Sequence, residues 1–366
     1  MKSKLINKIK TNKRLKSNLI TFGMVVSAYI LMEILMAAGV VSSLLKGLLV
    51  PLCIYAILAV SLNLTVGILG ELSLGHAGFM CVGAFSGAFF SKCMQDAIPI
   101  AGVRFTLALL IGALCAGLFG FLIGIPVLRL KGDYLAIVTL AFGEIIKNII
   151  NILYVGIDEN GFHFSTKSSL ELNLSENGKI IIQGAQGITG TPNDSTFTIG
   201  ILLLLITLII VLNLINSRDG RAIMAIRDNT IAAESVGINI TKYKLMAFSI
   251  SAALAGVAGV LYAHNLSTLT ALPKNFGYNM SIMILVFVVL GGIGNIRGSV
   301  IAAVILTLLP ELLRGLNDYR MLIYAVVLIV MMLFNWAPAC IKWREKMTYK
   351  IKSRFSPKKI KDGKEA

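Results

Sequence analysis

The sequence predicts an all-α membrane protein, a polytopic bundle of about ten transmembrane helices. Hydrophobic residues fill 56% of the 366 positions and charged residues 14%, and the mean hydropathy is +0.82. Soluble domains carry about 25% charged residues, so the composition excludes a soluble protein. Apolar runs of roughly 20 residues, the length that crosses a bilayer as a helix, recur along the chain.

Ten apolar runs mark the expected spans in chain order. The second contains Pro51 near its start, where a missing backbone N–H costs least. The third begins in a glycine-rich stretch, and the eighth is short enough to be a partial or re-entrant helix, so eight or nine full spans are an alternative. The expected ranges are 19–41, 46–69, a third ending near 91, 103–128, 133–154, 198–216, 244–264, 279–292, 298–313 and 320–338.

Basic residues are concentrated at both ends of the chain. Seven of the 34 Lys and Arg residues lie in 1–16 and ten lie in 342–364. In a soluble protein such tails would indicate nucleic-acid binding, but on a membrane protein they indicate cytoplasmic ends held near anionic lipid. We therefore expect basic cytoplasmic tails at 1–18 and 339–366, a transmembrane domain at 19–338, contact with membrane lipid and no nucleic-acid partner.

Two polar connections then fall on opposite sides of the membrane. The long connection 155–197 is expected outside, and the charged segment 217–243 is expected in the cytoplasm. Within this segment Asp228 or Asn229 can cap a short helix that stops at Gly237. A charged, capped helix between two spans must lie outside the bilayer, where a partner can reach it.

The chain carries no motif for an enzymatic reaction. The phosphate-binding pattern G-x-x-x-x-G-K-S/T is absent, as are H-E-x-x-H and G-x-S-x-G. The three histidines are far apart in the sequence, and the five cysteines show no metal-ligand spacing. We expect no catalytic residue, no metal site and no cofactor bound by this chain.

Polar side chains within the spans are the candidates for a substrate path, because such groups are costly in a membrane and mark function by default. Four of them are Asn63, Ser73, His76 and Thr139. Ser73 and His76 lie in the glycine-rich stretch, where a broken helix would expose backbone groups to a cavity. Tight packing with satisfied side chains is an equal alternative.

Glu144 and Lys147 interrupt the fifth span three residues apart, so they share a helix face and can form an ion pair. A structural pair facing the bundle is favoured over a role in transport. The spans hold few other carboxylates and no run of them, which argues against an ion-driven carrier.

Five motifs occur in order: LSLGHAGFMCVGAF, RLKGDYLAIVTLAFGEIIKNI, QGITGTP, GRAIMAIRDNTIAAESVGINITKYKLMAFSISAALAGVAGVLYA and VVLGGIGNIRGSVIAA. Together they resemble the LivM-type permeases of bacterial ABC importers for branched-chain amino acids, over about residues 45–335. The resemblance implies an inner-membrane subunit of the ABC importer permease type, which translocates leucine, isoleucine or valine by alternating access. It implies as partners a second, LivH-like permease, two cytoplasmic ATPases that bind the ATP, and an extracytoplasmic substrate-binding protein.

The resemblance also gives the charged segment a role. IAAESVG resembles the segment through which such permeases dock on their ATPase, which implies an interface at Arg221, Arg227, Asp228, Ala233, Glu234 and Gly237. The alternatives are a related permease for urea, amides or sugars, a stand-alone secondary carrier, and a membrane scaffold. The ligand of the binding protein, transport without an ATPase, and the absence of any flux would distinguish them.

Overall fold

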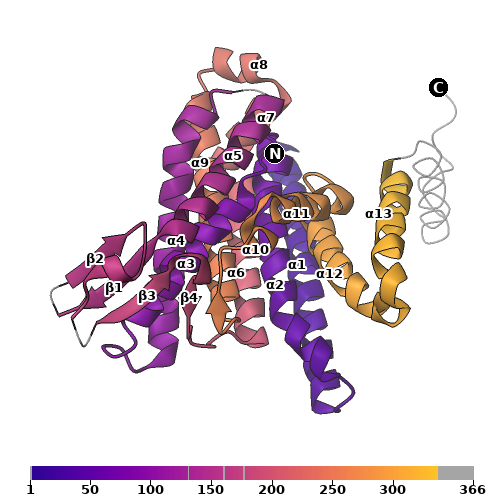
Figure 1. Ribbon diagram of the computed structural model, residues 1–366. Helices are drawn as coiled ribbons and strands as arrows, with labels where there is room; N and C mark the ends of the chain where they lie inside the picture. The colour runs from indigo at the N-terminus through magenta and orange to yellow at the C-terminus, as the bar shows by residue number, and fades with distance from the viewer. Residues whose placement is uncertain (1, 131, 160, 176–177, 337–366) are drawn as a thin grey trace, which may run out of the picture. The chain divides into compact units, whose positions relative to one another are not determined.

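The computed structural model describes residues 2–130, 132–159, 161–175 and 178–336. The chain divides into two compact units, Met1–Thr307 and Leu308–Ala366. Helices dominate the described residues (Figure 1). The α-helices are α1 (Lys2–Ala37), α2 (Ser43–Asn63), α3 (His76–Cys93), α4 (Ala101–Val127), α5 (Asp133–Ile152), α6 (Phe197–Asn216), α7 (Arg218–Asp228), α8 (Thr230–Ser235), α9 (Ile240–Ala263), α10 (Pro273–Phe276), α11 (Tyr278–Gly291), α12 (Ile296–Leu312) and α13 (Arg320–Trp336).

Four short helical segments of other types and five strands complete the description. The π-helical segment η1 follows α2 directly, and the others are 3-10 turns. The bounds are η1 (Leu64–Leu69), η2 (Leu170–Leu172), η3 (Gly184–Gln186), η4 (Leu313–Tyr319), β1 (Tyr154–Asp158), β2 (Gly161–Ser165), β3 (Lys179–Gln183), β4 (Ile188–Thr189) and β5 (Thr268–Leu269).

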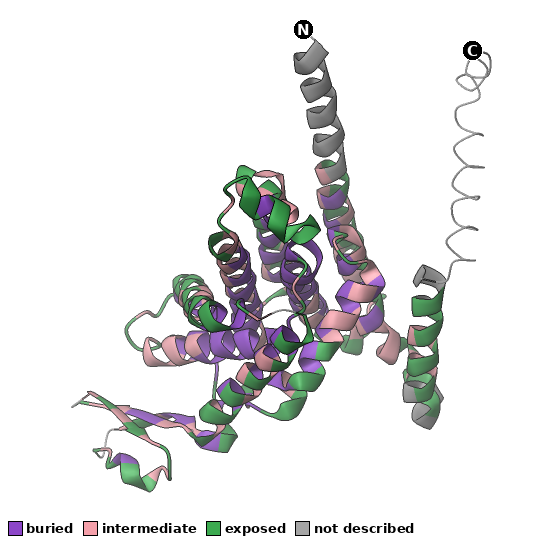
Figure 2. Ribbon diagram, turned by 90° about the horizontal axis from the view of Figure 1, so that it is seen from above, coloured by how far each residue is buried: buried purple, intermediate pink, exposed green. Residues whose placement is uncertain are grey.

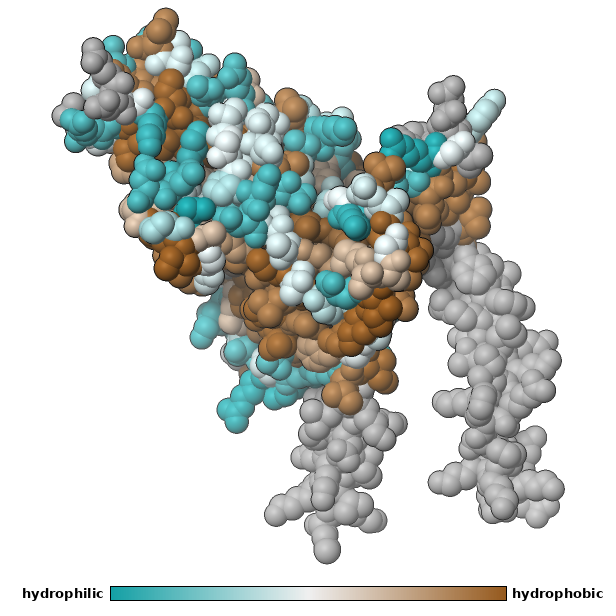
Figure 3. Space-filling model, turned by 90° about the horizontal axis from the view of Figure 1, so that it is seen from below, coloured by the Kyte–Doolittle hydropathy of each residue, from teal (hydrophilic) through white to brown (hydrophobic). Residues whose placement is uncertain are grey.

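The expected polytopic helical bundle is confirmed. Among the described residues, eight helical stretches are long and apolar enough to cross a membrane. The expected eighth span is one of them, because α10 and α11 together provide 19 residues over Pro273–Gly291. The 18 residues of α3 and the 17 of α13 fall outside this set, so the expected count of about ten is approximate. Figure 3 shows apolar side chains gathered in broad areas of the surface, as lipid contact requires.

The core is built on α2, α3 and α9, most of whose residues are buried. Figure 2 shows that buried residues gather in the interior of the bundle. Glycines let these helices approach closely: a Cβ on Gly83 of α3 would lie 2.3 Å from the Cα of Gly256 in α9. A Cβ on Gly256 would in turn lie 2.6 Å from the main-chain oxygen of Gly112 in α4. Small residues at such crossings replace the hydrophobic driving force that helices lack in lipid.

The long polar connection 155–197 is a folded β structure, which the sequence analysis did not predict. Strands β2, β1 and β3 form an antiparallel sheet in that order, with Val155 opposite both Phe164 and Ile182. Strand β4 pairs with β5, which follows α9. The prediction of a helical bundle therefore misses a small sheet, whose five-residue strands are too short to give a clear alternating pattern.

Candidate coupling site

The charged segment contains two helices, α7 and α8, where one was expected. The Ser217 hydroxyl caps α7 by accepting from the Gly220 N–H (3.0 Å), and the Asn229 side chain caps α8 by accepting from the Ala232 N–H (3.0 Å). Asn229 is thus the predicted cap, whereas Asp228 is the last residue of α7. Gly237 has φ +83°, a conformation that glycine adopts without strain and that ends the segment as predicted.

The residues expected at the interface divide into exposed and buried groups. Arg221, Arg227, Asp228, Glu234 and Gly237 are exposed, and Ala233 is 3% exposed. Ala233 therefore anchors α8 to the protein, and its neighbours on the outer face are the ones a partner can contact. That outer face also carries two large apolar side chains that the sequence analysis missed, Ile231 (81% exposed) and Val236 (74% exposed).

Arg227 connects this segment to the break at the end of α2. Its Nη1 donates to the main-chain oxygen of Gly67 in η1 (2.9 Å), and its Nε and Nη2 donate to Asp228 Oδ1 (3.1 and 2.9 Å). The side chain lies across Gly70, where an added Cβ would be 2.5 Å from Arg227 Cγ. Gly70 has φ +83° and ends the π-helical turn, so glycine is required there for both conformation and space.

Apolar packing joins the same elements. Leu64, Ile68 and Leu69 of η1 form a buried cluster with Ile223 of α7 and Ala247 of α9. Burial of such side chains stabilises by about 1.5–3 kcal/mol for each large one. The end of α2, the first helix of the charged segment and the start of α9 are therefore packed into one apolar cluster.

An ion pair also joins α9 to the chain that follows η1. Lys244 of α9 binds Glu71, which follows η1, and both side chains are largely buried, at 11% and 15% exposure. The sequence analysis assigned neither residue a partner. The partner is 173 positions away, so no local pattern could reveal it.

Asn63, expected on a substrate path, lies fully buried at the junction of α2 and η1. Its Oδ1 accepts from the Gly294 N–H (2.9 Å), and its Nδ2 donates to the Ser299 hydroxyl (2.8 Å). A Cβ on Gly67 would lie 1.9 Å from Asn63 Oδ1. The amide therefore joins η1 to the turn between α11 and α12, which agrees with the packing alternative for this residue.

His76 and Thr139 hold the segment that returns from η1 to α3. The His76 ring lies 2.7 Å from the Ser61 hydroxyl, and Thr139 Oγ1 accepts from the Leu74 N–H (3.0 Å). Both side chains are buried. Ser73 is also buried, and its hydroxyl has no hydrogen-bond partner among the described residues. Of the four candidates, Ser73 is therefore the one whose buried side-chain oxygen has no hydrogen-bond partner among the described residues.

The structure contains the ion pair expected in the fifth span. Glu144 binds Lys147 through Oε2, and its other oxygen accepts from the Tyr278 N–H (2.8 Å) at the start of α11. One carboxylate thus joins α5 to α11 and satisfies an N–H that the first turn of a helix leaves free. This arrangement agrees with a structural role.

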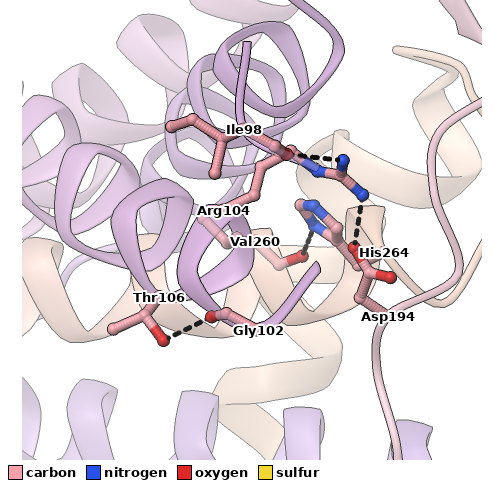
Figure 4. Close-up of polar contacts among 7 residues, drawn as sticks. All are labelled: Ile98, Gly102, Arg104, Thr106, Asp194, Val260 and His264. Carbon is pink, nitrogen blue, oxygen red and sulfur yellow. Dashed lines mark hydrogen bonds and ion pairs between the residues drawn. The ribbon is translucent and has the colours of Figure 1, made fainter. Parts of the chain in front are cut away.

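At the opposite end of the bundle, Arg104 of α4 fixes the chain before α6 (Figure 4). Its Nη2 donates to Asp194 (3.4 Å) and its Nη1 to the main-chain oxygen of Ile98 (3.3 Å). The His264 ring lies beside this pair, and its Nδ1 donates to the main-chain oxygen of Val260 (3.0 Å). The ends of α4 and α9 are therefore tied to the connection that carries the sheet.

An apolar cavity of about 460 Å³ lies between the sheet and helices α3, α4 and α5. Phe89, Ile149 and Phe162 are among its lining residues. Ser86 also lines it, and its hydroxyl donates to the Val82 main-chain oxygen of its own helix (2.7 Å). The cavity offers nothing to pair with ammonium and carboxylate groups, so it does not suit a free amino acid.

The structure is thus a helical membrane bundle in which a charged, exposed segment packs against a break in the second span. The family model for the permease component of branched-chain amino acid transport systems matches residues 44–334. The chain belongs to this family. It follows that the protein is a multi-pass membrane protein and a transport component.

Individual relatives agree with this assignment. The high-affinity branched-chain amino acid permease protein LivM of Salmonella typhimurium is 36% identical over 309 residues, 82% of this chain and 70% of that protein. LivM of Escherichia coli K12 is 36% identical over 294 residues, 78% of this chain and 67% of that protein. LivH of Salmonella typhimurium is 23% identical over 283 residues, 76% of this chain and 88% of that protein. No solved structure matches the chain.

Proposed function

We propose that this chain is the LivM-type permease subunit of an ABC importer for leucine, isoleucine and valine, working by alternating access. Two partner ATPases bind and hydrolyse the ATP, so this chain needs no cofactor of its own. A LivH-like permease completes the path, and an extracytoplasmic binding protein delivers the substrate. Two LivM relatives named for branched-chain amino acid transport, each 36% identical, support this assignment.

In this proposal α7 and α8 face the cytoplasm and the sheet faces outward. Helix α9 starts after α8 and ends before β5, so the charged segment and the sheet lie at opposite ends of one helix (Figure 1). The basic residues of 1–16 belong to α1. Further along this helix, the Thr21 hydroxyl accepts a hydrogen bond from Nε of Arg297, near the start of α12 (2.5 Å). Under the positive-inside rule, the end with these residues is cytoplasmic.

One contact carries the mechanism: Arg227 of the exposed segment donates to Gly67 in the break of α2. A partner that binds the outer face of α8 would displace α7, and Arg227 would transfer that displacement to η1. From η1 the Asn63 amide continues to the turn before α12. Helix α8 suits docking, since Ile231 and Val236 offer apolar contact area and Glu234 offers a charge that sets register.

The experiment is purification of the tagged chain from cells that express the whole transport operon, followed by reconstitution with its binding protein. We expect two ATPase subunits and a second permease to co-purify, and uptake of labelled leucine to require ATP. Uptake of leucine by this chain without any ATPase would overturn the proposal in favour of a secondary carrier. ATP-driven uptake of urea or a sugar, but not leucine, would assign a different cargo to the same machinery.

A further inference from the structure

A polar cavity of about 320 Å³ lies where three spans end. Asn18 begins the first span and Asn216 ends the span of α6, and both line the cavity. Ile296, which begins the span of α12, lines it too, beside Arg297. The cavity therefore lies at the level where the apolar helices meet the polar surface, in the headgroup region of the membrane.

The chemistry of the walls suits an anion. Arg297 supplies a guanidinium whose Nε donates to Thr21 (2.5 Å), and Asn18, Asn216 and Asn295 supply side-chain amides. The Asn216 amide uses one N–H on the Leu212 main-chain oxygen (2.7 Å), which leaves its second N–H for a ligand. No carboxylate is among the cavity's described lining residues. Arg221 adds a second guanidinium close by, since its Nη1 donates to the main-chain oxygen of Asn216 (3.3 Å). A cation would find no counter-charge here, whereas a phosphate would find charged and neutral donors.

The sequence next to the cavity is also positively charged, like Arg297 and Arg221. Helix α1 is continuous from Lys2 to Ala37, and Asn18, which lines the cavity, directly follows the basic first turns of this helix. Those turns hold seven Lys and Arg residues within 1–16, and the first acidic residue of the chain is Glu33. A basic stretch next to a span attracts anionic headgroups by about 1 kcal/mol for each charge near the surface.

We propose that this cavity binds the phosphate of an anionic phospholipid, whose acyl chains continue into the bilayer beside α1 and α6. The apolar part of the wall, which includes Ile68, Leu212 and Ile215, favours a lipid over a free anion. A dissolved phosphate would gain nothing from these side chains. The diacylglycerol part of a lipid would cover them, because the cavity opens where spans meet the headgroup layer.

A lipid headgroup in this cavity would stabilise the contacts that join α7, η1 and the turn before α12. Ile68 belongs to η1, and Gly294 donates to Asn63, so two wall residues belong to the connection described above. A bound headgroup would hold the turn before α12 against the ends of α1 and α6. This consequence rests on the proposed coupling function, whereas lipid binding itself does not.

The binding test uses the full-length protein, purified in a mild detergent and analysed by native mass spectrometry with phosphatidylglycerol or phosphatidylcholine added. We expect retained phosphatidylglycerol on the wild type and about a tenfold weaker association for Arg297→Gln, because one charge-assisted hydrogen-bonding group is lost. Arg297→Lys should retain most of the association. Arg129→Gln, which removes an exposed arginine that does not line the cavity, is the matched control and should bind as the wild type does.

Because Arg297 also binds Thr21, Asn216→Leu provides a second variant that removes a wall amide and keeps the charge; it should weaken association as well. Equal binding by wild type and both cavity variants, or equal loss in Arg129→Gln, would overturn the site. Full displacement of the lipid by millimolar inorganic phosphate would overturn the lipid assignment in favour of a free-anion site. Leucine uptake in phosphatidylcholine vesicles, measured separately, tests the coupling consequence: uptake unchanged by phosphatidylglycerol would overturn that consequence alone.

Discussion

Arg227 of α7 and Gly67 of η1 are 160 positions apart in the chain and are joined by a hydrogen bond of 2.9 Å. The donor belongs to a helix that faces water, and the acceptor belongs to a π-helical turn, in which the backbone pattern of a span is interrupted. Interruptions of this type recur at functional positions because their carbonyl groups are not all used within the helix. This contact makes the charged segment part of the membrane bundle.

Arg227→Gln should uncouple the transporter. The variant loses the charge that reaches Gly67, and a coupling free energy of about 1–3 kcal/mol would be removed. We expect the complex to assemble and hydrolyse ATP while leucine uptake per ATP falls about fivefold or more. Vesicle uptake and phosphate release, measured on one preparation, check this. Arg129→Gln is the control, and an unchanged uptake-to-hydrolysis ratio in Arg227→Gln would contradict the route.

Glu234→Lys should act on docking alone. Glu234 is exposed on α8, so its replacement should change the free energy of unfolding by less than about 0.5 kcal/mol. The reversed charge should weaken recovery of the ATPase subunits with the permease. Glu171→Lys, an exposed reversal in the region of the sheet, is the matched control. Equal ATPase recovery with both variants would remove Glu234 from the interface.

Gly67→Ala should destabilise the fold. The new methyl group would lie 1.9 Å from Asn63 Oδ1 and 2.4 Å from the Gly294 nitrogen, so the junction must open at a cost of about 1–3 kcal/mol. Gly47→Ala in α2 is the matched control, because nothing lies within 4 Å of its added Cβ. Thermal unfolding in detergent, followed by size-exclusion fluorescence, should separate the two. Equal unfolding midpoints for the two variants would show that the contact between Gly67, Asn63 and Gly294 accommodates the added methyl group at little cost.

Asn63→Leu should cost about 1–3 kcal/mol for each group it leaves unsatisfied, namely the Gly294 N–H and the Ser299 hydroxyl. Asn63→Asp keeps an acceptor for Gly294 but loses the donor to Ser299. If Asn63 instead contacted the substrate, Asn63→Leu would change the KM for uptake and leave the free energy of unfolding unchanged. Denaturation midpoints and uptake kinetics on the same samples distinguish these two outcomes.

Glu71→Gln should leave the Lys244 ammonium without its counter-charge in a largely enclosed position. Breaking such a pair costs about 1–3 kcal/mol when some solvent remains. The double variant Glu71→Leu with Lys244→Met should be less destabilised than the sum of its single variants, since it leaves no isolated charge. Additive losses in the double-mutant cycle would show that the two residues act independently.

The sequence predicted what depends on local composition. Runs of apolar residues located the spans within a few residues, and the Asn229 cap and the Gly237 stop were visible in a short window. The hydrogen-bond partners of Asn63 could not be predicted, because the sequence does not show whether a polar residue in a span faces a cavity or a main-chain turn. Its partners Gly294 and Ser299 are more than 230 positions away.

The sheet escaped prediction for a related reason. The strand Tyr154–Asp158 has only five residues, and its pairing with Lys179–Gln183 is shifted by an irregularity between Val155 and Gly156. Strands this short leave no clear period in the sequence. The ion pair between Arg104 and Asp194 was equally hidden, since each residue alone is an ordinary charge at the end of a span.

Helix α9 has no proline and runs unbroken for 24 residues, about 36 Å, from the end beside α8 to the end beside β5. Its first turns are held by the ion pair with Glu71, and the chain beyond it pairs with β4 through Thr268 and Thr189. A continuous helix held at both ends can transmit axial movement along its length. In the proposed importer, a displacement caused by ATP hydrolysis at the α8 end would thus reach strands β4 and β5 through a single helix.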